Sequence, residues 1–439
     1  MLKQVTIVAT AAAMWSGIAA AQENRIDMVR PDAPELAAHG QQAIGVRTIE
    51  LVNPDQIDIV NVEAGKDHPR YDRPLTVEVW YPADTTEQGG TYEGVYLRDG
   101  ETQVTLTGRA VRDAEPLAGD NAPYPLVIIS HGYPGNRFLL SHLAENLATK
   151  GYVVASIDHT DSTYNDQNKF GSTLVNRPLD QKFVLNEMER LSAEADGFLS
   201  GMVEPDNAAI VGYSMGGYGA MISAGAGVTQ ASTEYDWGAP DGTLGIHLSG
   251  SDTYATLPDE RVKAVVAFAP WGMNTGFWDA EGLKGVSKPV FIVAGSVDDV
   301  SLYEGGVKTI YDLSVNAPER FLLTFENANH NAAAPMPAPA QSWKHSEKLG
   351  FAPFEHYADA VWDTVRMNNI AQHFVTAFLG KYLKKDNEME AYLDLIPNAA
   401  DGVFALEENG NPKPEHTYWK GFGDRTAKGL TLQHATAAE

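Results

Sequence analysis

Short runs of consecutive apolar residues alternate with segments of helical periodicity through the middle of the chain. The runs predict buried strands at 126–129, 152–157, 208–211, 262–268, 290–294 and 321–325. The periodic segments predict helices at 138–147 and 179–191, a helix that begins at Met215, and a long amphipathic helix at 356–383. The pattern therefore predicts an α/β fold with a mostly parallel sheet and helices on both faces.

The first part of the chain has a less regular pattern. Residues 22–45 are polar and contain proline, which predicts a loose leader. Residues 75–81 alternate between apolar and polar side chains and stop at Pro82, as a strand does. The turn-forming residues around Arg98-Asp99-Gly100 indicate a hairpin.

Two stretches interrupt the α/β pattern, and a third follows it. Residues 160–178 and 224–258 are rich in Asp, Ser, Thr, Gly and aromatic residues, and each follows the end of a strand or helix. Loops at such positions carry function, so we expect lid-like insertions or pocket walls. Residues 386–439 are mostly polar and form a C-terminal extension. We expect a single domain over 22–439, with its core at about 70–385.

The first 21 residues have the pattern of a secretory signal peptide. Lys3 supplies the positive charge, an apolar stretch follows from Val5 to Ile18, and Ala19-Ala20-Ala21 fits a cleavage site. An uncleaved anchor is the alternative. We expect an exported protein, periplasmic or secreted, and no other segment is long and apolar enough to predict integral membrane association.

Composition narrows the partners and the chemistry. The chain has 439 residues, a formal net charge of -26 and no cysteine. A strongly acidic protein repels nucleic acid and anionic membrane surfaces, so neither is expected as a partner. The lack of cysteine excludes disulfides, thiolate zinc sites, iron–sulfur clusters and a cysteine nucleophile.

The pentapeptide Gly212-Tyr213-Ser214-Met215-Gly216 lies directly between a predicted buried strand and a predicted helix. A sharp strand-to-helix turn strains the backbone of the serine and lifts its hydroxyl above the sheet, and side chains at the glycine positions would clash. This context predicts Ser214 as a nucleophile. The alternative is an ordinary glycine-rich helix entry without chemistry.

A nucleophilic serine needs a histidine base and an acid that orients it. In folds with such a strand-to-helix turn, the acid follows the serine along the chain and the histidine follows the acid. Asp298 lies just past the predicted strand 290–294, and His330 lies in the small-residue loop after 321–325. We expect Asp298 to orient the imidazole of His330, with Asp299 as the alternative acid. His330 as an ordinary surface loop residue is the alternative to its role as base, with His345 and His356 as fallback bases.

The tetrahedral intermediate needs hydrogen-bond donors for its oxyanion. One donor is the backbone N–H of Met215, directly after the nucleophile. The loop 130–135 follows the strand 126–129, and its Tyr133 backbone N–H supplies the second donor. His131 in the same loop is expected to hold the loop rather than to react.

Several other residues near the expected edge of the sheet are candidates for binding. Trp271 and His159 are tentative substrate-binding residues, since both follow predicted strand ends. A core tryptophan and a loop-capping histidine are the alternatives. Asp158, Asp161 and Asp166 could hold a calcium ion, but their spacing matches no EF-hand, so no metal site is assigned.

Four motifs in the chain resemble the platelet-activating-factor acetylhydrolase and dienelactone-hydrolase-like branch of the α/β-hydrolase family. They are Val77-Glu-Val-Trp-Tyr-Pro-Ala83, Pro125-Leu-Val-Ile-Ile-Ser-His-Gly132, Leu147-Ala-Thr-Lys-Gly-Tyr-Val-Val-Ala-Ser-Ile-Asp-His159 and Gly212-Tyr-Ser-Met-Gly-Gly217. The resemblance implies an α/β-hydrolase fold, no metal, and a triad of Ser214, Asp298 and His330. It also implies an oxyanion hole at Tyr133 and Met215.

Dienelactone hydrolases use a cysteine nucleophile, which this chain lacks, so their activity is not carried over. The residues and the resemblance together predict a cofactor-free, exported serine hydrolase of carboxylic esters that works through an acyl-enzyme. Short acyl esters, lipid-derived esters and polyesters are the expected substrates. A serine peptidase or amidase on the same fold and a catalytically inactive binding protein are the alternatives.

Overall fold

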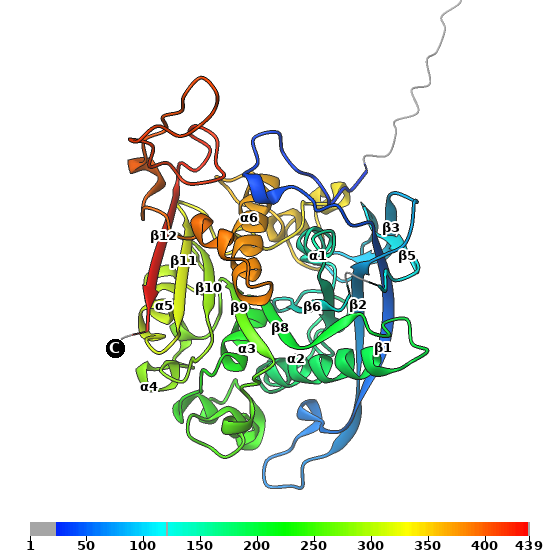
Figure 1. Cartoon of the computed structure of the whole chain (residues 1–439). Helices are drawn as coiled ribbons and strands as arrows, with labels where there is room; N and C mark the ends of the chain where they lie inside the picture. Colours follow the sequence, from blue (N-terminus) through cyan, green and yellow to red (C-terminus); the bar gives the residue numbers. More distant parts are fainter. Residues whose placement is uncertain (1–22, 120–121, 438–439) are drawn as a thin grey trace, which may run out of the picture.

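A ten-stranded sheet runs through the molecule in the order β12-β11-β10-β9-β8-β6-β7-β2-β1-β5 (Figure 1). The structure, a computed structural model, describes residues 23–119 and 122–437, so the predicted signal peptide 1–21 lies outside the described residues. The strands are β1 (Ile44–Ile57), β2 (Arg70–Pro82), β5 (Val111–Arg112), β6 (Tyr124–Ser130), β7 (Val153–Asp158), β8 (Val203–Tyr213), β9 (Val262–Phe268), β10 (Val290–Gly295), β11 (Glu319–Phe325) and β12 (Leu430–Thr436).

The central part of the sheet is parallel, as the apolar runs predict. Neighbouring strands from β7 through β6, β8, β9 and β10 to β11 all pair in parallel. Antiparallel pairs flank this part, with β2 on β7, β1 on β2, and β12 on β11. The predicted hairpin around residues 98–100 is confirmed, since β3 (Gly90–Tyr96) and β4 (Gln103–Gly108) form a separate antiparallel pair.

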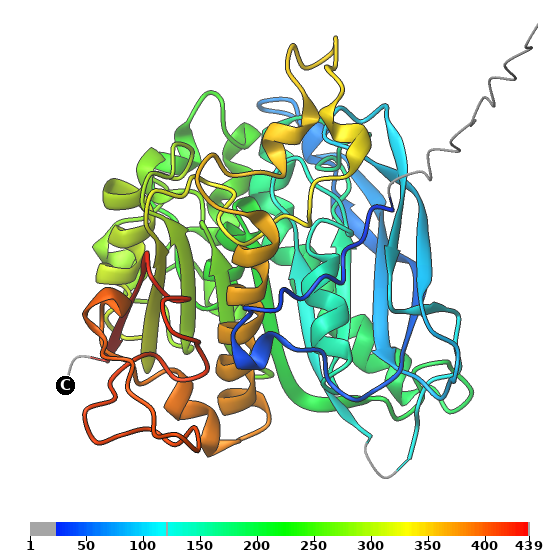
Figure 2. The same ribbon diagram turned by 90° about the horizontal axis from the view of Figure 1, so that it is seen from above.

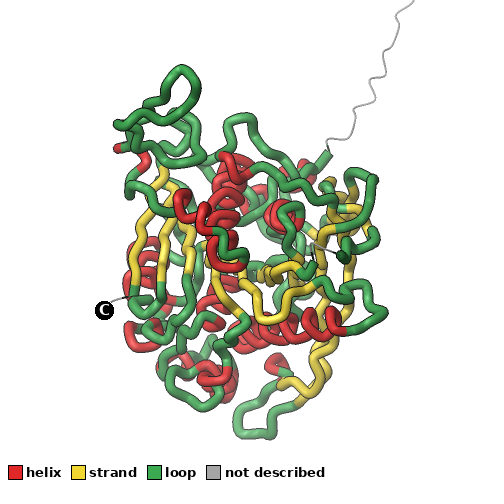
Figure 3. The backbone as a smooth tube through the Cα atoms, viewed as in Figure 1, coloured by secondary structure: helices red, strands yellow, loops and turns green. Residues whose placement is uncertain are grey.

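Helices cover both faces of the sheet (Figure 3). They are α1 (Ser141–Ala148), α2 (Phe170–Ala193), α3 (Met215–Ser223), α4 (Ala280–Leu283), α5 (Thr309–Leu313) and α6 (Thr364–Leu383). The side chains of β6 alternate between two apolar layers: Val127 and Ile129 pack in the layer with α1 and α6, and Leu126 and Ile128 pack in the layer with α2, α3 and α5. The prediction of helices on both faces is confirmed.

Single helical turns connect these elements. The short 3-10 helices are Glu35–Ala37, Ile59–Asn61, Ala231–Glu234, Pro240–His247, Tyr254–Thr256, Met273–Thr275, Ala340–Trp343, Pro353–His356, Asn387–Tyr392 and Ala399–Asp401, and a π-helical turn covers Tyr303–Lys308. The segment that leads from β11 to α6 stands out from the body of the molecule, yellow in Figure 2. Among the described helices, none is both long and apolar enough to cross a bilayer.

Three helices differ from their predicted bounds, and the helix predicted at 138–147 begins three residues later, at Ser141. The helix predicted at 356–383 begins at Thr364, because the Asp363 side chain accepts a hydrogen bond from the Arg366 N–H at 2.8 Å and caps the helix there. The helix predicted at 179–191 begins instead at Phe170 and contains Pro178. Proline removes one intrahelical hydrogen bond, so the sequence favoured a helix start after it, although the helix continues through it. Half of the predicted insertion 160–178 is therefore helical.

Two strands of the sheet lie outside the predicted core of about 70–385. β1 begins at Ile44, at the end of the predicted loose leader 22–45, and β12 lies in the C-terminal extension. In β12 only Leu430 and Leu432 are buried, and polar residues alternate with them. A strand near or at the edge of a sheet buries few side chains, so its apolar pattern is too short to predict it.

Candidate active site

Ser214 occupies a strained turn between β8 and α3. Its backbone angles are φ 52° and ψ -112°, a region that non-glycine residues rarely adopt. A Cβ atom on Gly212 would lie 2.1 Å from the carbonyl oxygen of Gly216, and a Cβ on Gly216 would lie 1.9 Å from the carbonyl oxygen of Ser130. The turn therefore requires glycine at both positions, which explains the two glycines of the pentapeptide 212–216.

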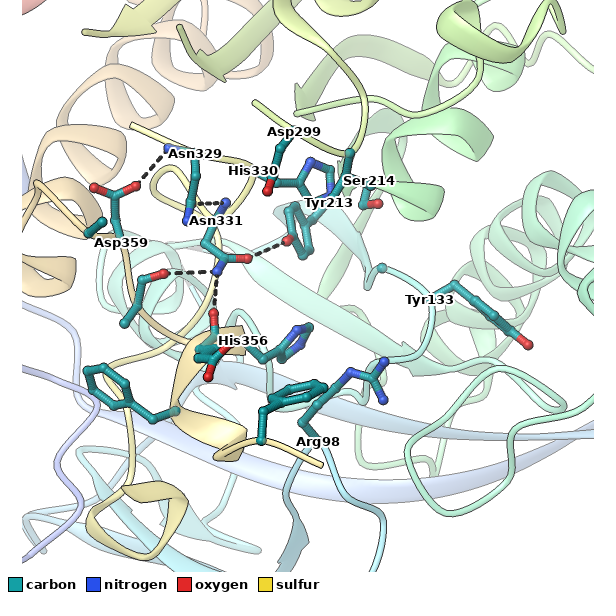
Figure 4. A pocket seen from close by; sticks show the side chains of 17 residues that line it. Arg98, Tyr133, Tyr213, Ser214, Asp299, Asn329, His330, Asn331, His356 and Asp359 are labelled. Carbon is teal, nitrogen blue, oxygen red and sulfur yellow. Dashed lines mark hydrogen bonds between the residues drawn. The ribbon is translucent and has the colours of Figure 1, made fainter. Parts of the chain in front are cut away.

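A cavity of about 670 Å³ opens above this turn, and Ser214 and His330 both line it (Figure 4). Loops after β6, β8, β10 and β11 contribute Tyr133, Ser214, Asp299 and His330 to its wall. The segment 351–360 closes the other side. The carboxyl ends of neighbouring parallel strands thus bring together residues that are far apart in the sequence.

The Asp298 carboxylate orients the His330 ring. Its two oxygens lie 2.9 and 3.1 Å from His330 Nδ1, and Oδ1 also accepts the backbone N–H groups of Val300 and Ser301 at 2.9 and 2.8 Å. Burial alone would raise the pKa of Asp298, but these hydrogen bonds outweigh burial and hold the pKa below its usual value. The carboxylate therefore stays charged, and Nδ1–H donates to it, which leaves the lone pair on Nε2.

The alternative acid, Asp299, does not reach the imidazole. Its side chain is exposed and lies on the rim of the cavity, with no hydrogen bond to His330 among the described residues. The Ser214 hydroxyl forms no hydrogen bond with another described residue either. Asp298 and His330 are hydrogen-bonded to each other. Ser214 lines the same cavity as His330, and its hydroxyl has no hydrogen-bond partner among the described residues.

The two expected oxyanion donors lie at the start of α3 and in the loop after β6. Met215 is the first residue of α3, so its N–H has no partner within the helix. The Tyr133 N–H has no acceptor among the described residues, while its phenol donates to the carbonyl of Asn168 at 2.7 Å. Both amides are thus free to bind a ligand.

The loop that carries Tyr133 is held from below by α2. Arg177 donates to the carbonyl of His131 at 2.7 Å, and its guanidinium is buried. His131 is itself buried and accepts the backbone N–H of His159 at 3.3 Å. His131 therefore supports the loop and does not face the cavity.

The structure does not bring His159 to the cavity. Its ring is 1% exposed and lies between Ser130 Oγ and Asp180 Oδ2, each 2.9 Å from a ring nitrogen. Burial and the charge of Arg177 lower its pKa to about 3, so the ring is neutral. His159 links β6 to α2 as part of the frame beneath the site.

Trp271 lies beside the cavity without lining it. Its backbone N–H donates to the carbonyl of Ser214 at 3.2 Å, and its ring packs against Phe170 and Phe277 at centroid distances of 5.4 and 5.1 Å. Trp237, 51% exposed, stands edge-on to it at 6.4 Å. Trp271 therefore belongs to an aromatic cluster next to Ser214.

A buried ion pair supports this whole region. Arg73 in β2 donates from two nitrogens to both oxygens of Asp180 in α2, at 2.8 and 2.9 Å, and both side chains are buried. Burial alone would raise the pKa of Asp180, but the charge of Arg73 and the hydrogen bond from His159 lower it to about 2. The pair fixes α2 and therefore Arg177, which holds the loop 130–135.

Sequence reasoning missed Asn331, which joins three parts of the site. Its side-chain oxygen accepts the hydroxyl of Tyr213 at 3.1 Å, and its nitrogen donates to the carbonyls of Glu355 and Ala358 at 2.9 Å each. Asn331 therefore connects Tyr213, the residue before Ser214, to the segment 351–360. Its position directly after His330 is the only signal the sequence offers.

The described residues contain no group of three or more His, Asp or Glu side chains with metal-binding geometry. The three aspartates considered for calcium accept hydrogen bonds from the protein itself. Asp158 accepts from Arg137, Asp161 from Ser172, and Asp166 from the backbone N–H of Asp161.

Comparison with known proteins identifies the fold. The family model of platelet-activating factor acetylhydrolase, isoform II, matches residues 71–188. Cutinase est1 of Thermobifida alba is 22% identical over 213 residues, which cover 48% of this chain and 55% of that protein. Cutinase 2 of Thermobifida cellulosilytica is 24% identical over 213 residues, which cover 48% of this chain and 63% of that protein. This chain therefore spans a little over half the length of these curated relatives.

A solved structure, ferulic acid esterase from Streptomyces cinnamoneus, aligns with 81% of this chain and 94% of its own at a TM-score of 0.51 and 20% identity. Together with the strand order and the turn at Ser214, this likeness confirms the predicted α/β-hydrolase fold.

The buried Arg73–Asp180 pair yields a stability test. We expect Asp180→Asn to lower the free energy of unfolding by about 3 kcal/mol at pH 7, because the buried guanidinium of Arg73 then keeps only the longer pair with Asp161, at 3.3 Å, as its counter-charge. Folding lowers the pKa of Asp180 from 3.8 to about 2, so the pair contributes fully above about pH 4 and its contribution is lost as the pH falls through 2. Urea unfolding at several pH values measures both effects.

The matched control is Asp32→Asn, which breaks an exposed pair with Arg30 of similar length, 2.8 Å. Exposed pairs contribute at most about 1 kcal/mol, so this variant should unfold close to the wild type. Equal losses in the two variants would contradict the assignment of a structural role to the buried pair.

Proposed function

We propose that this chain, an α/β-hydrolase by fold, is a serine hydrolase of carboxylic esters. The observation that carries the proposal is the paired Asp298 and His330 in the same cavity as the strained Ser214. The cutinases and the ferulic acid esterase similar to this chain support an ester as the bond that is cleaved. The proposed catalytic residues are Ser214, Asp298 and His330.

In the proposed reaction, Ser214 Oγ attacks the ester carbonyl while His330 Nε2 takes its proton. The tetrahedral oxyanion accepts the N–H groups of Met215 and Tyr133, and one such donor contributes about 3–4 kcal/mol to transition-state stabilisation. The bond between the acyl carbon and the alcohol oxygen then breaks, and His330 gives the proton to the leaving alcohol oxygen. Water attacks the resulting acyl-enzyme by the same route and releases the acid.

The Asp298 carboxylate holds the imidazole in the reactive tautomer and stabilises its positive charge in the transition state. Its low pKa keeps it charged through the cycle. No metal or organic cofactor takes part in this proposal, since the triad and two backbone amides supply every proton transfer and charge contact.

The proposed substrates are short acyl esters, lipid-derived esters or polyesters. Phe351, Phe354 and Val300 give the cavity an apolar wall for an acyl or alcohol group. The aromatic cluster of Trp271, with Phe170 and Trp237 from the two predicted insertions, offers a further surface beside the nucleophile. His159, tentatively a substrate-binding residue, takes the role of a supporting residue in this proposal.

We also propose that residues 1–21 direct export and are removed, and that 22–439 form one domain in the periplasm or outside the cell. The basic start, apolar stretch and small-residue cleavage pattern support export. The presence of β1 and β12 in one sheet supports a single domain, because strands from both ends of the described chain share its hydrogen bonds.

The nucleophile is tested by a fluorophosphonate probe, which forms a covalent bond with an activated serine. We expect the wild type to be labelled at Ser214 and the variant Ser214→Ala to remain unlabelled, as measured by mass spectrometry of the intact protein. Ser223→Ala, at the other end of α3, is the control and should be labelled like the wild type. Equal labelling of Ser214→Ala would overturn the proposal.

The acid is tested by paired variants of neighbouring residues. We expect Asp298→Asn to lower kcat for a p-nitrophenyl ester by about 10⁴-fold, because the amide favours the wrong tautomer of His330. Asp299→Asn changes an exposed carboxylate without contact to the imidazole, so kcat should stay within a few-fold of the wild type. A larger loss in Asp299→Asn than in Asp298→Asn would assign the acid to Asp299.

The bond type is tested by p-nitrophenyl esters of rising acyl length beside a p-nitroanilide of the same acid. We expect kcat/KM to be higher for at least the shorter esters than for the anilide, because p-nitrophenolate leaves without a proton, whereas the anilide nitrogen must be protonated as its bond breaks. Faster cleavage of the anilide than of every ester would favour the alternative, a serine peptidase or amidase on the same fold.

A further inference from the structure

The hairpin β3–β4 brings one arginine, Arg98, into the wall of the active-site cavity. In the sequence, Arg98 indicates only the turn of this hairpin. Of all the residues that line the cavity, Arg98 is the one with a permanent positive charge. Figure 4 shows its guanidinium directed into the open space between His356 and Tyr133, on the side of the cavity opposite His330.

The guanidinium of Arg98 has no ion pair and donates no hydrogen bond to any residue that the structure describes. Every other arginine of the described chain has at least one such partner; the buried guanidinium of Arg73, for example, donates to Asp180, and that of Arg177 donates to the carbonyl of His131. Arg98 is itself partly buried. A charge that is partly withdrawn from water without a counter-ion is unfavourable, so an unpaired arginine in a cavity is a site for an anionic group.

The turn that carries Arg98 is fixed in place. Gly100 lies so close to the segment after β7 that a Cβ atom there would be 2.0 Å from the carbonyl oxygen of Tyr164. Lys348, three residues before the segment 351–360, donates to the carbonyl of Asp99 at 2.6 Å, and the Asp99 side chain accepts the N–H groups of Glu101 and Thr102. The guanidinium is therefore presented by a rigid support, as specific binding requires.

The neighbours of Arg98 do not compete with it for an anion. His356 Nε2 is hydrogen-bonded to the Tyr164 hydroxyl at 2.7 Å. Burial and the nearby charge of Arg98 lower the pKa of His356 to about 3, so this ring is neutral. Arg98 is thus the single fixed cation on this side of the cavity.

The other charged residues of the cavity wall are carboxylates. Asp359 accepts the backbone N–H groups of Asn329, Val361 and Trp362 at 2.7, 2.8 and 2.7 Å, while Asp299 and Glu355 are exposed. Like charges disfavour an anion near these groups, so only the place beside Arg98 accepts one. A single guanidinium balances one carboxylate, and its planar pair of N–H donors matches the two carboxylate oxygens.

We propose that Arg98 is a specificity-determining residue that binds a carboxylate of the substrate, so that the preferred esters carry a free carboxylate away from the bond that is cleaved. This inference rests on the proposed ester hydrolysis at Ser214, which shares the cavity with Arg98. The substrate class is the monoester of a dicarboxylic acid, or an ester whose alcohol part carries a carboxylate.

The test compares charged and neutral esters in matched pairs. Mono-p-nitrophenyl esters of adipate, pimelate and suberate carry the carboxylate on the acyl part, on chains too long for it to attack its own ester readily, and their methyl-capped diesters are the neutral partners. 4-Acetoxybenzoate and its methyl ester place the same difference on the alcohol part. The chain-length series reports the distance from Ser214 to the anion site, and the two arms report on which side of the ester the carboxylate binds.

We expect Arg98→Gln to lower kcat/KM for the preferred charged esters by about tenfold to a hundredfold, mainly through a higher KM, because a hydrogen bond to a charged group is lost. Hydrolysis of the neutral partners should stay within about twofold of the wild type. Arg98→Lys should retain part of the preference, since it keeps the charge but loses the planar fork. Rising salt should reduce the preference in the wild type.

The control is Arg109→Gln, which removes the same charge just beyond β4, outside the active-site cavity, and should leave the ratio of charged to neutral rates unchanged. An unchanged ratio in Arg98→Gln, or equal losses for charged and neutral esters, would overturn the anion site while the ester hydrolase stands. A wild type that cleaves neither kind of ester would overturn the proposed function, and the anion site with it.

Discussion

The close approach of two backbone segments at Ser214 is the constraint on which the candidate site depends. The carbonyl of Ser130, at the end of β6, lies where a side chain on Gly216 would be, and the turn at Ser214 keeps a backbone conformation with positive φ. Pairing of β6 with β8 fixes the first segment, and α3 fixes the second. The strain is maintained because the sheet below leaves the turn no room to relax.

The frame beneath the turn is polar, whereas the rest of the interior is apolar. Two apolar layers lie on the faces of the sheet. The space under the loop 130–135, in contrast, contains four buried and hydrogen-bonded polar side chains, those of Arg73, His159, Arg177 and Asp180. The hydrogen bonds of these side chains have defined directions, so they hold the loop in one position more strictly than apolar packing would. Phe170 and Trp237, from the two predicted insertions, pack beside the cavity, and Arg98 of the hairpin and the segment 351–360 line it.

The parts of the fold that the sequence predicts are those whose side chains are buried on both faces. The parallel strands are continuous apolar runs, and the turn at Ser214 has its own glycine pattern, so both could be recognised from the residues alone. The pairing of Asp298 with His330 followed from the order of strand ends, and the structure shows that hydrogen bond. Neither β1 nor β12 was predicted, because strands near or at the edge of a sheet bury few side chains and show only a weak alternation of apolar and polar residues. Asn331 was missed because its partners come from remote segments, and Arg98 was missed because only the fold brings its hairpin to the cavity that Ser214 lines.

The place of β12 has a consequence for how the chain folds. Until residues 430–436 have been synthesised, the backbone groups of β11 that pair with β12 have no partner, and the apolar layer around Phe374 lacks Leu430 and Leu432. An open strand edge beside a half-covered core is a surface on which chains associate wrongly. The sheet therefore reaches its final width only when almost the whole chain is available, so the slowest contacts to form join residues that are more than 100 positions apart.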